Sequence, residues 1–126
     1  MHARNMRESV ERIHQGLPVA AALALKDALG LTNSDLAGLL GVSVRTLARW
    51  TQSSRLDPVA GDRLDRAARL LETAVGVLED QQAAVAWLRS PQRALGGSVP
   101  IELASTDIGV RAVEALLGRM EHGVYT

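Results

Sequence analysis

The chain of 126 residues has no cysteine and no phenylalanine, and its aromatic residues are two tryptophans and one tyrosine. The absence of cysteine excludes disulfide bonds and thiolate metal sites. A hydrophobic core must therefore be built from leucine, valine and alanine. A chain of this length can bury one good core or two small ones.

Long apolar runs are also missing, although 47% of the residues are hydrophobic. No run approaches the roughly 18 to 20 apolar residues that a membrane span needs. Residues 1–16 are charged and do not resemble a secretion signal. We therefore expect a cytoplasmic protein with no membrane partner.

Residues that commonly carry catalysis or hold metals are sparse. His2, His14 and His122 are far apart in the sequence and lack the spacing of a metal site. Gly96 and Gly97 follow no strand pattern, so they predict a turn and not a phosphate-binding loop. No nucleophile stands beside a base. We expect no metal, no cofactor and no enzymatic activity.

The net charge is zero, but the charges are unevenly divided along the chain. Residues 1–69 carry ten basic and seven acidic side chains, and residues 70–126 carry four basic and seven acidic ones, which leaves +3 and −3. A basic front part suits nucleic acid, and an acidic rear part suits a different partner. This pattern is consistent with two domains, 1–69 and 70–126.

No segment alternates as a β-strand does, and glycine and proline divide the chain into helical patterns, so we predict an all-α fold. Helices are expected over 4–15, 18–29, 58–79, 83–88 and 106–122, with irregular structure over 90–100. The 58–79 helix is expected to begin at Asp57-Pro58 and to bury one stripe made of Leu64, Ala67, Leu71, Ala74, Val75 and Leu78.

Two acid–base pairs lie opposite that stripe, Asp62 with Arg66 and Asp65 with Arg69. Such pairs, four residues apart on a helix, are most simply a solvent-exposed face stabilised by a few tenths of a kcal/mol each. Contact with nucleic acid is the alternative for this face.

The segment 31–52 contains two short helical patterns joined by a turn at 41–43. Thr32 is expected to cap the first helix, while Asp35 reaches back to the Thr32 amide. The apolar face of this helix consists of Leu36, Leu39 and Leu40.

The joint between the two helices has the residues that such a turn requires. Gly41 is predicted to take the left-handed conformation that ends a helix, and Ser43 to cap the next one. Ala37 is small enough to let two helices cross closely. Gly38 departs from the pattern, because a glycine inside a helix costs roughly 1 kcal/mol relative to alanine. The spacing predicts a helix-turn-helix, with an ordinary helical bundle as the alternative.

In the second helix Leu47 and Trp50 are expected to face inward. The residues expected to face outward, toward DNA, are Val44, Arg45, Thr46 and Arg49. Arg45 is expected to bond to guanine, and Val44 to touch a thymine methyl group. Ser43, with the helix N-terminus, is expected to hold a phosphate. The full predicted DNA-binding set is Ser43, Val44, Arg45, Thr46, Arg49 and Arg55.

The rear part carries the pattern Trp-Leu-x-x-Pro-x-x-x-Leu-Gly-Gly-x-x-Pro over 87–100, followed by a predicted helix that ends Arg-x-x-x-Gly-Val-Tyr over 119–125. Within this helix, Gly109 is expected to allow close approach of another helix. Together with Arg-Thr-Leu-x-Arg-Trp over 45–50, the chain resembles the Xre/ParS/MbcA-type antitoxins. The resemblance covers roughly residues 23–126. It implies an Xre-like helix-turn-helix followed by a small helical toxin-binding domain.

That resemblance implies a homodimeric antitoxin of a type II toxin–antitoxin system, which binds operator DNA and represses its own operon. Its partner would be a cognate RES-domain toxin, an enzyme that consumes NAD or transfers ADP-ribose from it. In similar antitoxins the end of the last helix and the chain terminus cover the toxin's NAD pocket. The corresponding residues here are Arg119, Met120, Glu121, His122, Gly123, Val124, Tyr125 and Thr126.

The position of Tyr125 is consistent with an interface, because it is the only tyrosine and follows the helix-ending Gly123 by two residues. At an interface its ring would bury on the order of 150 to 200 Å². A frayed end, or a ring packed on Trp87, is the alternative. Two alternatives exist for the whole protein: a stand-alone dimeric repressor, and an interaction module whose helix-turn-helix does not bind DNA.

Overall fold

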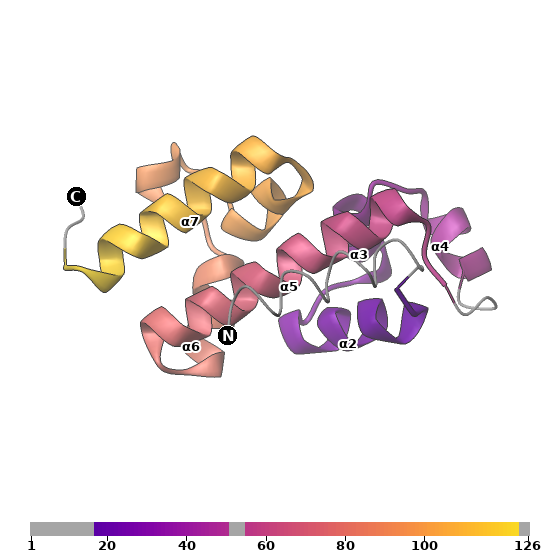
Figure 1. The fold of residues 1–126 in the computed structure, drawn as a ribbon, viewed down its shortest axis with the longest axis horizontal. Coiled ribbons are helices and arrows are strands. Elements are labelled where there is room, and N and C mark those ends of the chain that lie inside the picture. The colour runs from indigo at the N-terminus through magenta and orange to yellow at the C-terminus, as the bar shows by residue number, and fades with distance from the viewer. Residues whose placement is uncertain (1–16, 51–54, 124–126) are drawn as a thin grey trace. The chain divides into compact units, whose positions relative to one another are not determined.

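The computed structural model describes residues 17–50 and 55–123. The helix expected over 4–15, residues 51–52 of the predicted helix-turn-helix, and the tail residues Val124, Tyr125 and Thr126 lie outside the described residues. Within those ranges the chain forms α-helices and short 3-10 helices and has no β-strand (Figure 1). The all-α prediction is confirmed. None of the described helices is long and apolar enough to cross a membrane.

The chain divides into two compact units between Asp65 and Arg66. The first unit contains α2 (Val19–Leu29), α3 (Asn33–Leu40), α4 (Val44–Trp50) and the start of α5 (Pro58–Leu78). The backbone segments that precede α2 and α5 are joined, because the Leu56 N–H donates to the Leu17 carbonyl at 2.8 Å. The core of this unit is aliphatic, as expected, and includes Ala22, Leu25, Leu29, Leu36, Leu40, Leu47, Leu56 and Leu64.

The helix ends of the first unit follow the local signals in the sequence. α2 ends at Gly30, which is left-handed with φ 65°. Asp57 caps α5, because its carboxylate accepts from the Ala60 N–H at 2.8 Å. The predicted boundaries at Leu29 and Pro58 are therefore confirmed.

The second unit contains the rest of α5, followed by α6 (Gln81–Leu88), two 3-10 helices and α7 (Asp107–Glu121). The 3-10 helices are η1 (Arg93–Leu95) and η2 (Pro100–Ser105), so the segment expected to be irregular contains short regular turns. The Gln92 N–H donates to the Ser98 carbonyl at 3.0 Å and closes the η1 loop. α7 packs on both η1 and η2.

The buried stripe of α5 differs from the prediction. Leu64, Ala67 and Ala74 are buried as expected, and so is Leu70, which is 0% exposed. Leu71, Val75 and Leu78 were expected in the core but are only half-buried. A helix turns by about 100° per residue, so neighbouring positions lie on the two edges of one stripe. Packing decides which edge is covered.

The opposite side of α5 is not simply a solvated face. Asp62, Asp65 and Arg66 are half-buried, and only Arg69 of the two predicted pairs is exposed. Each of these four residues takes part in an interaction.

Candidate functional site

The turn between α3 and α4 is built as the sequence predicts. The Asp35 N–H donates to the Thr32 hydroxyl and the Thr32 N–H donates to the Asp35 carboxylate, each at 3.0 Å. α3 ends at Gly41, which is left-handed with φ 75°. Ala37 is buried with 2% exposure. These contacts confirm the capping box and the helix-ending glycine.

Arg63, a residue far along the chain, lies close to this turn. A Cβ atom at Gly41 would lie 2.7 Å from Cζ of Arg63 and would also collide with one of its guanidinium nitrogens. Arg63 belongs to α5, and its cation therefore lies over the C-terminal end of α3, where the helix dipole favours positive charge. Sequence reasoning missed Arg63, because no local pattern links it to Gly41.

Gly38 has no such neighbour. An ideal Cβ atom built there meets no other atom within 4 Å. Nothing in the structure explains a glycine at this position of α3.

The N-terminus of α4 is capped by Ser43. The Ser43 hydroxyl accepts from the Thr46 N–H and donates to the Thr46 hydroxyl, each at 3.0 Å. Leu47 is the one fully buried residue of α4, and Trp50 is half-buried. Thr46 was expected to face outward but is half-buried. Its hydroxyl is already engaged by Ser43.

The remaining predicted DNA-binding residues are exposed, three of them on α4 and one before α5. Val44 is 48% exposed. Arg45 and Arg49 are both exposed, as is Arg55 in the segment before α5. Two exposed guanidinium groups on one short helix can donate bidentate hydrogen bonds to base edges or phosphates.

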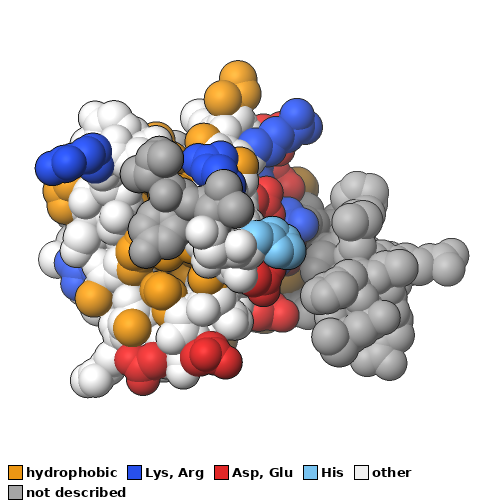
Figure 2. Space-filling model, turned by 90° about the vertical axis from the view of Figure 1, so that its left-hand side faces the viewer, with side chains coloured by type: hydrophobic (Ala, Val, Ile, Leu, Met, Phe, Trp, Pro, Cys, Tyr) orange, Lys and Arg blue, Asp and Glu red, His pale blue; other side chains and the backbone are white. Residues whose placement is uncertain are grey.

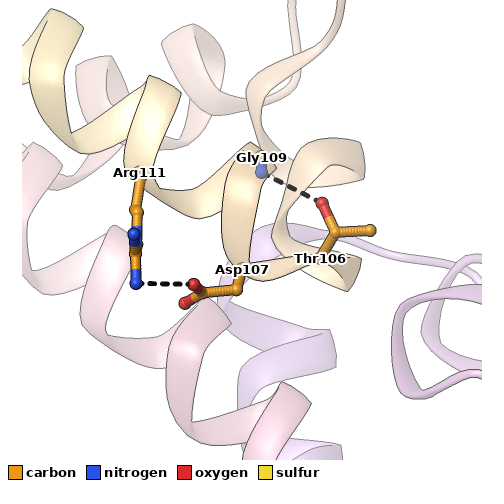
Figure 3. Close-up of polar contacts among 4 residues, drawn as sticks. All are labelled: Thr106, Asp107, Gly109 and Arg111. Carbon is orange, nitrogen blue, oxygen red and sulfur yellow. Dashed lines mark hydrogen bonds and ion pairs between the residues drawn. The ribbon is translucent and has the colours of Figure 1, made fainter.

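α7 begins at a capped and tightly packed end, shown in Figure 3. The Gly109 N–H donates to the Thr106 hydroxyl at 3.0 Å. A Cβ atom at Gly109 would collide with the carbonyl of Leu103. The expected close approach at Gly109 is therefore made, and the approaching element is the 3-10 helix η2.

The C-terminal end of α7 carries the first of the predicted toxin-binding residues, most of which are exposed. Glu121 is the last residue of the helix, His122 is its C-cap, and Gly123 is left-handed with φ 73°. Arg119, Glu121, His122 and Gly123 are exposed, and Met120 is half-buried. Figure 2 shows basic, acidic and hydrophobic side chains all exposed on the side of the molecule where α7 ends.

A helix-turn-helix followed by a small helical unit defines a class of protein in which one chain carries two potential binding surfaces. Residues 8–71 match the antitoxin Xre-like helix-turn-helix domain. Residues 73–123 match the antitoxin Xre/MbcA/ParS C-terminal toxin-binding domain. The chain belongs to this antitoxin family.

Two proteins similar to this chain are named antitoxin Xre. An antitoxin Xre of Yersinia enterocolitica is 29% identical over 119 residues, which cover 93% of this chain and 80% of the relative. An antitoxin Xre of Photorhabdus laumondii is 26% identical over 114 residues, which cover 89% of this chain and 77% of the relative. A chain in the crystal structure of the M. tuberculosis MbcT-MbcA toxin-antitoxin complex has a TM-score of 0.63 and 27% identity, with 86% of this chain and 96% of that chain covered. The expected family is thus confirmed.

Proposed function

We propose that this antitoxin neutralises a RES-domain toxin, an enzyme that consumes NAD or transfers ADP-ribose from it, by covering the toxin's NAD pocket with its C-terminal end. The observation that carries the proposal is the match of residues 73–123 to a toxin-binding domain. The exposed end of α7 supports it, because Arg119, Glu121 and His122 project there beside a left-handed Gly123 that ends the helix. The residues that follow include Tyr125, the one tyrosine of the sequence.

Deletion of Gly123–Thr126 tests this mechanism. The truncated antitoxin should fail to stop NAD consumption by the toxin, while its far-UV circular dichroism and melting temperature stay unchanged. These residues follow the last helical turn, so their loss removes none of the described core. A truncated chain that inhibits as well as the full chain would rule out occlusion by the terminus.

The second part of the proposal is that the antitoxin binds the operator of its own operon as a homodimer. The exposed Arg45 and Arg49 on α4 support this role, together with Val44 at the start of that helix. One helix-turn-helix contacts few base pairs, and two copies on a palindrome give the affinity that repression needs. The expected base contacts are worth about 1 to 3 kcal/mol each.

Substitution Arg45→Ala tests DNA binding. The affinity of this variant for the DNA upstream of the antitoxin gene, measured by fluorescence anisotropy, should fall about 5- to 150-fold. Inhibition of the toxin should be unchanged. Arg93→Ala is the matched control, because it removes the same charge from an exposed position outside the helix-turn-helix.

Two outcomes would contradict this part of the proposal. Equal damage to DNA binding and toxin inhibition would count against separate sites. A lack of operator binding at low salt, where phosphate attraction is strongest, would instead favour an interaction module that does not bind DNA.

A further inference from the structure

The outward side of α7 carries a row of exposed residues that the core does not use. They are spaced by four, three, four and three positions, which places them in one line along a helix. All are exposed, and none is acidic. We call this row the outer seam: Ile108, Ala112, Ala115, Arg119 and His122.

The residues that hold α7 in its unit lie on the other side of the helix. They are Gly109, Val110, Val113, Leu116 and Leu117, all buried. The outer seam is therefore not needed to hold α7 in place.

Ile108 is the most exposed of the large hydrophobic residues in the described ranges. Its exposure is 82%, compared with 65% for Val59, 48% for Val44 and 37% for Leu23. Gly118 lies beside the seam, and a Cβ atom there would meet nothing within 4 Å. The seam thus offers one protruding aliphatic side chain near the start of α7 and, further along the helix, two alanines with Gly118 beside them, which suits close packing against another molecule.

We propose that the outer seam is the anchoring surface for the toxin, separate from the tail that inhibits it. This inference rests on the proposed function. The seam is continuous with the predicted toxin-binding residues, because Arg119 and His122 belong to both. From Ile108 to His122 the seam extends about 21 Å along α7.

Charge indicates a partner other than a second copy of this chain. Arg119 makes no ion pair with the described residues. In a pairing of two outer seams it would find no carboxylate within the facing seam, whose one other ionisable side chain is His122. The partner surface that fits has an apolar pocket for Ile108 and a carboxylate near Arg119.

The area of the seam limits what it can bind alone. A helix is about 10 Å wide, so one seam covers on the order of 200 Å². A stable interface buries about 800 Å² on each partner. The seam must therefore form one part of a larger contact with the toxin.

Ile108→Asp tests the anchor. The dissociation constant of this variant for the toxin encoded next to the antitoxin should rise about 10- to 100-fold. Inhibition of NAD consumption should still be complete at saturating concentrations, because the tail is intact. Val59→Asp is the matched control: it places the same charge at an exposed aliphatic position outside the seam and should leave toxin affinity unchanged.

A second pair of variants separates this inference from the proposed function. Arg119→Glu should weaken toxin binding as Ile108→Asp does, whereas deletion of Gly123–Thr126 should abolish inhibition with a smaller loss of affinity. Wild-type toxin affinity in Ile108→Asp would overturn the anchor and leave the tail mechanism standing. A change of oligomeric state in Ile108→Asp, with unchanged toxin affinity, would mean that the seam joins two antitoxin chains. That result would also overturn the role of the seam as an anchor for the toxin.

Discussion

α4 and α7, the two helices that present candidate binding residues, are held in their units by different means. α4 has seven residues, of which Leu47 alone is fully buried. α7 has fifteen residues and five buried positions. A short helix with one anchor depends on its turn and its cap, whereas a long helix with several anchors keeps its place when one is lost. α4 can expose most of its surface because the left-handed Gly41 and the Ser43 cap define the turn before it.

The largest effect on stability is expected from removing a buried leucine from each helix. Leu47→Ala and Leu116→Ala should each lower the free energy of unfolding by about 2 to 5 kcal/mol, measured by urea denaturation. Hydrogen exchange should then show a different local effect in each of the two variants. The amides of α4 should lose protection in Leu47→Ala, while those of α7 stay protected in Leu116→Ala because other buried residues remain. Equal local loss in both helices would mean that α4 and α7 depend on a single buried leucine to the same extent.

A smaller effect is expected where α7 meets η2. Gly109→Ala should destabilise the protein by about 1 to 3 kcal/mol, because the new methyl group would collide with the backbone of Leu103. Gly118→Ala is the control in the same helix: it meets nothing within 4 Å and should stabilise the helix by up to roughly 1 kcal/mol. Thermal melting of the two variants should therefore shift in opposite directions. A shift in the same direction would mean that η2 does not constrain Gly109.

The caps should have still smaller effects that differ in their consequences. Ser43→Ala and Thr106→Ala should each reduce stability by about 1 kcal/mol. Only Ser43→Ala should also weaken operator binding, because α4 is short and carries the exposed arginines. Anisotropy titrations of both variants with the same DNA measure this. Equal DNA affinity in the two variants would show that α4 is positioned without its cap.

The smallest effect is expected at the ion pair on the surface of α7. Arg111 and Asp107 are 2.9 Å apart and are 77% and 62% exposed (Figure 3). Arg111→Ala should lower stability by only about 0.3 to 0.5 kcal/mol at low salt, and by less at high salt. Urea denaturation at two ionic strengths checks this. A loss above 1 kcal/mol would mean that α7 relies on its surface charges as well as on its core.

Local signals in the sequence predicted the elements that depend on neighbouring residues. Thr32, Ser43 and Thr106 cap their helices because a hydroxyl reaches a backbone N–H three residues ahead. Gly41 ends α3 because it accepts a left-handed conformation. The motifs over 87–100 and 119–125 carried the resemblance that the family matches confirmed. The individual DNA-binding and toxin-binding residues stay predictions.

The helical class, the family and most helix ends follow from the sequence, because each depends on contacts within a few residues or on a continuous motif. The expected start at Ala83 was wrong, because Asp80 caps α6 and the helix begins at Gln81. Folding brought the Arg63 guanidinium close to Gly41 and the Leu103 carbonyl close to Gly109, and it buried Leu70 more deeply than Leu71. It also decided which residues of α7 face outward. Burial is a relation between surfaces brought together by folding, and the periodicity of one helix cannot specify the surface it will meet.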